Sequence, residues 1–278
     1  MTNFEKKSTD FNYDNNIEMT LNGITIFDGF TIEDARLINY NGNKESITIP
    51  SFVRSIAAQA FMGNKTIKKV IIPENVILVG SLAFANCSNL SNIKIENKNI
   101  IIGEGAFDRT LWYNEQNDGL VYYENILYSV KGEYNSNIEI KKGTTSTSPF
   151  AFYNCKELKS VTVPESVQVI NTGTFMDCTS LKEINLIGNE LKYIYDMAFK
   201  NCEKIKKLYL PTSVRHIGKA FMGCCNLKNI LIYDNVKFID EGAFENCNIT
   251  IYCLENSYAH NFAIQHNINF SIYEPKSK

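Results

Sequence analysis

The sequence of 278 residues lacks several features that would point to particular classes of protein. Lysine and arginine number 28 against 30 aspartate and glutamate, so the net charge of -2 leaves no basic excess for nucleic acid or an anionic membrane. No stretch of the sequence approaches the roughly 18 consecutive apolar residues that a membrane-spanning helix needs. We therefore expect no nucleic-acid partner and no membrane insertion.

Motifs for catalysis and metal binding are also scarce. The chain has three histidines, and it contains neither a His-Glu-x-x-His motif nor a Cys-x-x-Cys pair. His216 precedes Cys224 by eight residues, which is only weak evidence for a nucleophile and its base. We expect no enzyme activity, no metal and no cofactor, with a thiol-dependent enzyme as the least favoured alternative.

What the sequence does contain is one unit that recurs along most of its length. In residues 151–170 the unit reads as an Ala-Phe pair, a cysteine, an apolar-x-x-apolar-x-apolar run, a proline and two apolar residues three apart. The phenylalanine of the pair marks the period at Phe61, Phe84, Phe107, Phe152, Phe175, Phe199, Phe221 and Phe244. The intervals are 22 to 24 residues, except for one of 45 that equals two periods. A period in the low twenties is typical of leucine-rich repeats, in which each unit supplies a strand and a return segment.

The repeat predicts an α/β, β-rich leucine-rich repeat solenoid. Parallel strand ladders would be joined by return segments that contain short helical turns, with neighbouring rungs stacked about 4.8 Å apart. We expect one solenoid domain, whose parts are an N-terminal cap over residues 1–46, the repeat array over 47–248, a C-terminal cap over 249–272 and a tail over 273–278. Within the caps we expect short strands at 24–27, 38–40 and 268–270 and a helix within 256–266.

A degenerate rung is expected at about residues 110–137, where the skeleton of the repeat lapses. The segments 120–123 and 126–130 are typical of a β-hairpin, and the only tryptophan, Trp112, precedes them. We expect this rung to cover the neighbouring core with its aromatic side chains. A protruding binding element is the alternative, because insertions in solenoids map to loops on one face.

Most of the cysteines keep a fixed position in the repeat. Six of the eight lie three residues after the repeat phenylalanine: Cys87, Cys155, Cys178, Cys202, Cys224 and Cys247. This position favours a ladder of reduced, buried thiols, because stacked β-carbons that point the same way are poorly placed for disulfides. The alternatives are at least one disulfide bridge, or a metal or redox site. Cys225 and Cys253 fall outside the ladder, so we expect them to be the more reactive thiols.

The outward-facing residues of the repeat strands vary while the core positions stay apolar. We call this surface the strand face, and its candidate partner-binding residues are Lys69, Ile71, Lys94, Ser160, Thr162, Glu183, Asn185, Lys207, Tyr209, Asn229 and Leu231. Tyr209, between Lys207 and Leu231, is the expected anchor because tyrosine supplies amphipathic contact area. The alternative is that these are ordinary solvated strand residues.

The unit Ile/Val-Pro-x-x-Val-x-x-Ile-x-x-x-Ala-Phe-x-x-Cys-x-x-Leu, over residues 47–248, resembles the BspA-type leucine-rich repeat. That family is common in bacterial surface proteins and in some parasitic protists, and its members are generally described as adhesins or interaction proteins. The resemblance implies a partner that is another protein, or a host or cell-surface component, bound through the strand face. A structural or self-assembling surface component is the alternative, and we expect a monomer with at most weak self-association.

Two observations point to different locations for the protein. Residues 1–16 are polar and carry charges where a signal peptide would have an apolar run, which predicts a cytoplasmic protein. The resemblance implies a secreted or cell-surface protein. Both locations stay open at this point.

Overall fold

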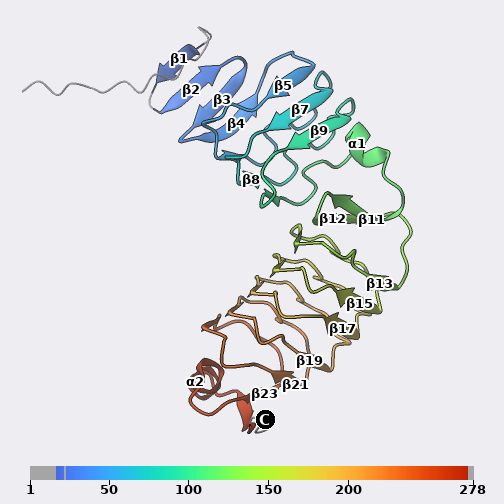
Figure 1. Ribbon diagram of the computed structural model, residues 1–278, viewed down its shortest axis with the longest axis vertical. Helices are drawn as coiled ribbons and strands as arrows, with labels where there is room; N and C mark the ends of the chain where they lie inside the picture. The colour runs from blue at the N-terminus through green and yellow to red at the C-terminus, as the bar shows by residue number, and fades with distance from the viewer. Residues whose placement is uncertain (1–16, 22, 275–278) are drawn as a thin grey trace, which may run out of the picture. The chain divides into compact units, whose positions relative to one another are not determined.

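The computed structural model describes residues 17–21 and 23–274. Residues 1–16 of the expected N-terminal cap, residue 22, and residues 275–278 of the expected tail lie outside the described part. Contacts divide the described residues into two compact units. Unit 1 comprises the described residues up to 100 and residues 105–114, and unit 2 comprises residues 101–104 and 115–274; Figure 1 labels their strands and helices. The boundary near residue 114 falls where the skeleton of the repeat lapses. The domain limits drawn from the sequence stay a prediction.

Unit 1 starts with an antiparallel meander and continues as parallel rungs. The meander consists of β1 (Ile17–Leu21), β2 (Ile24–Phe27), β3 (Phe30–Glu33) and β4 (Arg36–Tyr40). In the rungs, β4, β6 (Ser55–Ile56) and β8 (Leu78–Val79) form one parallel ladder, and β5 (Ser46–Thr48), β7 (Lys69–Ile72) and β9 (Asn92–Ile95) form another. The short helix α1 (Leu111–Asn114) follows. The strands predicted at 24–27 and 38–40 are confirmed, and pairing changes from antiparallel to parallel at β4.

Unit 2 contains two sets of parallel strands, which lie on opposite sides of each rung. The return ladder consists of β14 (Ser146–Thr147), β16 (Val169–Ile170), β18 (Tyr193–Ile194), β20 (His216–Ile217) and β22 (Phe238–Ile239). The other set forms two sheets, β13 (Asn137–Glu139), β15 (Ser160–Val163) and β17 (Glu183–Leu186), then β19 (Lys207–Tyr209), β21 (Asn229–Leu231), β23 (Thr250–Cys253) and β24 (Asn269–Ile272). This is the leucine-rich repeat solenoid that the period predicts.

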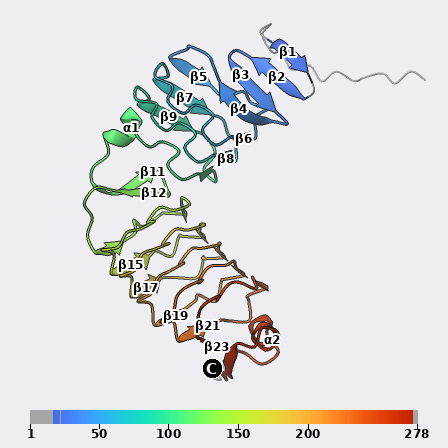
Figure 2. The ribbon, with the colours of Figure 1, turned by 180° about the vertical axis from the view of Figure 1, so that it is seen from behind.

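The two ends of unit 2 depart from the repeat. The short strand β10 (Ile101–Ile102) precedes helix α1 in the chain. One end of unit 2 is formed by a hairpin of β11 (Gly119–Tyr123) and β12 (Ile126–Lys131), and β12 pairs in parallel with β14. The hairpin contributes Leu127 to the core and packs Leu120 and Tyr122 against it. At the other end, helix α2 (Tyr258–Gln265) lies beside β23 (Figure 2), capped at its start by Ser257, whose hydroxyl accepts from the His260 amide at 3.2 Å.

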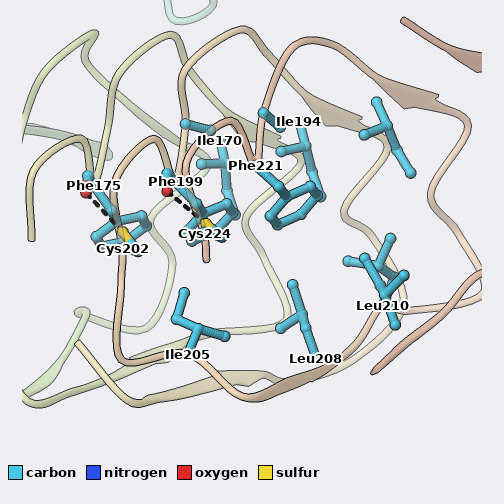
Figure 3. Close-up of a cluster of buried hydrophobic side chains, with 14 of the residues drawn as sticks. Ile170, Phe175, Ile194, Phe199, Cys202, Ile205, Leu208, Leu210, Phe221 and Cys224 are labelled. Atoms are coloured by element: carbon cyan, nitrogen blue, oxygen red, sulfur yellow. Dashed lines mark hydrogen bonds between the residues drawn. The ribbon is translucent and has the colours of Figure 1, made fainter. Parts of the chain in front are cut away.

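Stacked phenylalanine rings form the centre of each core. In unit 2 the ring centroids of consecutive repeat phenylalanines are 4.9 to 5.6 Å apart and the rings nearly parallel, along Phe152, Phe175, Phe199, Phe221 and Phe244. Figure 3 shows part of this column together with isoleucine and leucine side chains of the same core. A ring at the end of an isolated rung would face water, so the stack is what buries it.

A backbone conformation that recurs in every repeat explains which residue type lies two positions after each repeat phenylalanine. All eight of these residues adopt positive φ between 57° and 76°: Gly63, Asn86, Arg109, Asn154, Asp177, Asn201, Gly223 and Asn246. Glycine, asparagine and aspartate tolerate this left-handed conformation best, which accounts for seven of the eight identities. The turn sends the chain from the phenylalanine to the cysteine and the next strand.

The ladder on the strand side is interrupted once within unit 2. No strand pairing joins β17 to β19 in the described residues, although the return strands β18 and β20 of the same rungs stay paired. The interruption coincides with the one interval of 24 residues in the repeat, which places an additional residue between Leu186 and Leu191. As a result Ile184 and Leu186 are half-buried, whereas Val161 and Val163 of β15 are buried.

The stacked core gives the first prediction. Phe199→Ala removes a fully buried ring that touches two neighbouring rings, so the free energy of unfolding should fall by about 3–5 kcal/mol. Urea denaturation followed by circular dichroism measures the change. The control is Tyr153→Ala, whose side chain is 48% exposed and meets the Phe150 ring edge to face, so it should lower stability by no more than about 1.5 kcal/mol. Equal effects of the two substitutions would contradict the stacked core.

Candidate functional site

The structure places all the predicted partner-binding residues on the outside of their strands. Lys94, Glu183, Asn185, Lys207, Tyr209 and Asn229 are exposed, and the other five are half-buried. The register aligns them in two columns, as in the pairs Lys207 with Asn229 and Tyr209 with Leu231. Lys69, Ile71 and Lys94 belong to unit 1, and the remaining eight belong to unit 2. Their role in binding stays a prediction.

Within unit 2 the interruption after β17 separates the candidates into two groups. Ser160, Thr162, Glu183 and Asn185 lie on β15 and β17, where they pair in register. The second group lies on β19 and β21. A shallow hollow of about 320 Å³ lies between the two sheets and is lined by Lys182, Glu183, Ile184, Asn185, Leu186, Lys207, Leu208 and Tyr209. The open ladder therefore leaves a hollow where continuous pairing would have placed Glu183 directly beside Lys207.

A larger hollow, of about 800 Å³, lies at the C-terminal end of the strand face. We call it the tyrosine hollow, and it is lined by Leu208, Tyr209, Asn229, Leu231, Tyr233, Asp234, Tyr252, Leu254, Tyr273 and Glu274. Its volume lies in the range of about 300–1,000 Å³ that ligand pockets occupy. Of the predicted residues it gathers Tyr209, Asn229 and Leu231. The other residues were missed by the sequence analysis.

Strand register explains how tyrosines from distant parts of the sequence meet here. Parallel pairing places Leu231 beside Tyr209 on one side and beside Tyr252 on the other. Tyr233 lies two residues after Leu231, and Tyr273 lies two residues after Ser271, which pairs with Tyr252. The rings of Tyr233 and Tyr273 meet edge to face, with centroids 6.1 Å apart at 80°. The alternation of residues 250–254 was the signal that could have revealed Tyr252, because it continues the strand pattern into the region expected to be a cap.

The tyrosine hollow combines apolar walls with exposed rings. Tyr209 is 62% exposed and Tyr252 is 37% exposed. The Lys207 ammonium stands 5.9 Å from the centroid of the Tyr209 ring, within cation–π range. Burial raises the pKa of the Tyr273 phenol, with smaller contributions from Tyr233 and Asp234, so this ring stays protonated at neutral pH. Exposed aromatic rings beside leucines are a composition typical of interface cores.

The cysteine ladder has the place that its register predicts, and all eight cysteines are free thiols. Five ladder thiols donate to the carbonyl of the repeat phenylalanine one rung earlier, at Sγ–O distances of 3.0–3.1 Å: Cys87, Cys178, Cys202, Cys224 and Cys247. Figure 3 marks two of these contacts, from Cys202 to Phe175 and from Cys224 to Phe199. The thiols therefore join consecutive rungs by weak hydrogen bonds.

The ladder thiols are poor nucleophiles at neutral pH. Burial raises the pKa of Cys87, Cys155 and Cys247 to about 11, and it raises those of Cys178, Cys202 and Cys224 further. A thiol must ionise to act as a nucleophile, so these shifts suppress reactivity at neutral pH. Cys225 is exposed, as expected for a thiol outside the ladder.

The prediction that Cys253 is a reactive thiol is wrong. Cys253 is the last residue of β23, and its side chain points into the core because strand residues alternate between faces. Burial also raises its pKa. Its sequence position outside the ladder register concealed the fact that it continues the inward set of Ile249 and Ile251.

The structure gives His216 and Cys224 different contacts, and it offers no metal-binding group among the described residues. His216 stacks on Phe238, with ring centroids 4.6 Å apart, whereas the Cys224 thiol donates to Phe199. No group of three or more histidine, cysteine, aspartate or glutamate side chains in residues 17–21 and 23–274 could hold a metal ion. Likewise, no helix in the described part of the chain has the length and apolar character to cross a membrane.

Parallel rungs, stacked phenylalanines and an exposed strand face define a leucine-rich repeat solenoid. The sequence profile described as BspA type Leucine rich repeat region matches the chain in six copies over residues 20–115 and 128–269. The chain therefore belongs to the BspA-type leucine-rich repeat family, and the resemblance is confirmed. Proteins of this family are generally non-enzymatic repeat proteins that act as protein-interaction modules, commonly secreted or on the bacterial surface.

Several solved structures of bacterial leucine-rich repeat proteins are similar to the chain. The pneumococcal vaccine antigen PcpA is 15% identical over 87% of this chain and 84% of its own, with a TM-score of 0.48. A leucine-rich repeat protein from Bacteroides ovatus is 18% identical over 95% of this chain and 100% of its own, with a TM-score of 0.41. A leucine rich cell surface protein from Faecalibacterium prausnitzii is 22% identical over 86% of this chain and 76% of its own, with a TM-score of 0.31. No curated protein matches the chain.

Thiol accessibility gives the second prediction. Ellman's reagent should label about one thiol per native chain, Cys225, because the ladder thiols and Cys253 are buried or hydrogen-bonded with raised pKa values. The remaining thiols should react after unfolding in guanidinium. Cys225→Ala should remove the fast phase, and Cys253→Ala should leave it unchanged. A fast phase that survives Cys225→Ala would show that the ladder opens.

Proposed function

We propose that this chain is a non-enzymatic interaction module that binds another protein, or a host or cell-surface component, through the strand face of unit 2. The single observation that carries the proposal is the tyrosine hollow, which gathers four tyrosines and two half-buried leucine side chains on a ladder of paired strands. A soluble domain seldom leaves such a surface without a partner. The family supports a binding role of this general kind.

The scaffold suits binding because its surface needs little ordering. Tyr209, Leu231 and Tyr252 are aligned on neighbouring paired strands. The side chains that alternate with them on these strands lie in the core. A surface that is already ordered loses less conformational entropy when a partner binds. Tyrosine adds to this effect, since it supplies a large contact area with few rotatable bonds. We therefore infer an adhesin-like contact centred on the hollow.

A location outside the cytoplasm fits this role best. The family commonly occurs in secreted and surface proteins, and an adhesin-like contact requires access to the partner. Free thiols do not oppose it, because the ladder cysteines are placed for stacking and not for disulfides. The cytoplasmic location expected from residues 1–16 is the alternative.

Self-assembly is a second candidate function, which one observation favours. Strand β24 stands at the end of its sheet, and it exposes Phe270 and Ile272 at 40% and 42%. An edge strand with exposed apolar side chains can pair with a second copy. Multi-angle light scattering distinguishes the two candidates, since self-assembly predicts a mass that rises with concentration and falls for Ile272→Lys.

The third prediction concerns the strand face. The double substitution Lys207→Ala with Tyr209→Ala removes the exposed ring and the ammonium above it, so capture of the partner should weaken at least tenfold without loss of stability. The measurement starts from partners that the intact chain captures from lysates and from extracellular-matrix components. Affinity for each captured partner is then measured by surface plasmon resonance.

The matched control is Tyr153→Ala with Lys156→Ala. These residues are an exposed tyrosine and lysine in the turn after Phe152, away from the strands. The control should leave capture unchanged. Equal capture by both double variants would show that the partner binds elsewhere, and equal loss in both would point to a general surface effect.

A further inference from the structure

We propose that the tyrosine hollow receives a positively charged side chain, lysine or arginine, from an extended segment of the partner. This inference deepens the proposed function and rests on it. The two ends of the hollow differ in charge. At the end formed by Tyr233 and Tyr273, the lining residues Asp234 and Glu274 carry carboxylates. At the end formed by Tyr209, the ammonium of Lys207 stands over the ring.

The two carboxylates are available to a ligand. Both residues are exposed, and neither forms an ion pair with any residue in 17–21 or 23–274. The Lys237 ammonium donates to the main-chain carbonyl of Asp234 at 3.2 Å, and it forms no ion pair with the Asp234 carboxylate. A cationic ligand would therefore meet two carboxylates that have no competing ion pair within the described chain.

The rings beside these carboxylates suit a cation as well. Tyr233 and Tyr273 meet at 80°, so one ring presents its edge to the other and the two do not cover each other face to face. A cation within about 6 Å of a tyrosine face is attracted by the quadrupole of the ring. Burial is the largest cause of the raised pKa of Tyr273, and Tyr233 and Asp234 contribute in the same direction.

The size and composition of the hollow fit a side chain attached to a chain segment. Leu231 and Leu254 line the hollow between the rings and can pack against the methylene stem of lysine or arginine. The volume of about 800 Å³ exceeds what one side chain needs, which leaves room for the flanking residues of the segment. Lys207 repels a basic side chain at the Tyr209 end, so the cation should lie at the Asp234 end.

The test uses the full chain with carbon-13 label in its tyrosine rings and two pentapeptides as probes. The first is acetyl-Gly-Ser-Lys-Ser-Gly-amide, and the second has norleucine in place of lysine, which keeps the stem and removes the charge. Variants Tyr233→Phe, Tyr252→Phe and Tyr273→Phe assign the ring signals. We expect the lysine peptide to shift the signals of Tyr233 and Tyr273. The norleucine peptide should bind with at least tenfold lower affinity. An arginine peptide should behave like the lysine peptide.

Charge variants supply the matched comparison. The double substitution Asp234→Asn with Glu274→Gln should lower the affinity for the lysine peptide about tenfold and leave the affinity for the norleucine peptide unchanged. The control, Glu157→Gln with Glu203→Gln, removes the same charge from exposed turns and should change neither. Raising the sodium chloride concentration from 50 to 500 mM should weaken binding of the lysine peptide, because salt screens partly exposed charges.

Four outcomes would overturn the inference. They are equal binding of the lysine and norleucine peptides, shifts confined to tyrosines outside the hollow, no shift with either peptide, or saturation by a neutral oligosaccharide such as maltotetraose but not by lysine. Partner capture separates this failure from failure of the proposed function. Capture that is lost with the Lys207 and Tyr209 substitutions but kept with the Asp234 and Glu274 substitutions would retain the strand face and reject the cation.

Discussion

Dependence of each rung on its neighbours is the constraint from which the rest of the molecule follows. The Phe199 ring stacks between those of Phe175 and Phe221, its amide donates to the Ala220 carbonyl at 2.8 Å, and its carbonyl accepts the Cys224 thiol. Inward positions are therefore fixed by contacts on two sides, which keeps the period regular. Outward positions contact one another at the surface, as where the Ser160 hydroxyl donates to Asn137 of the preceding rung, and they do not fill the core. Their identities can therefore vary, and they are the positions that can carry a binding surface.

Two departures from regular stacking shape that surface. One additional residue before Leu191 separates β17 from β19, which opens the strand side while the return strands stay paired. At the end of unit 2 the last strands, β23 and β24, extend the sheet beyond the repeats and place Tyr252 and Tyr273 beside the column of Tyr209. The tyrosine hollow is thus a product of the end of the array, and its residues come from a repeat and from the terminal segment together.

The sequence predicts the fold well because its signals are local and repeated. A fixed spacing of phenylalanine, cysteine and strand residues determines rung length, the inward set and the position of the thiols. The residues of the hollow could not be predicted in the same way. Tyr233 lies beyond the end of its strand, and Tyr252 and Tyr273 lie after the last Ala-Phe pair, so only the register of three strands brings them together. The orientation of Cys253 could not be predicted from the repeat either, since it depends on strand pairing after the last repeat.

Photocrosslinking from inside the hollow tests the central claim most directly, namely that the partner contacts the strand face of unit 2. The full chain would carry p-benzoylphenylalanine at position 252, or at position 153 as a control on an exposed turn. The account predicts a covalent adduct with the captured partner from position 252 and none from position 153. An adduct from position 153 alone would place the partner on another surface and contradict the account.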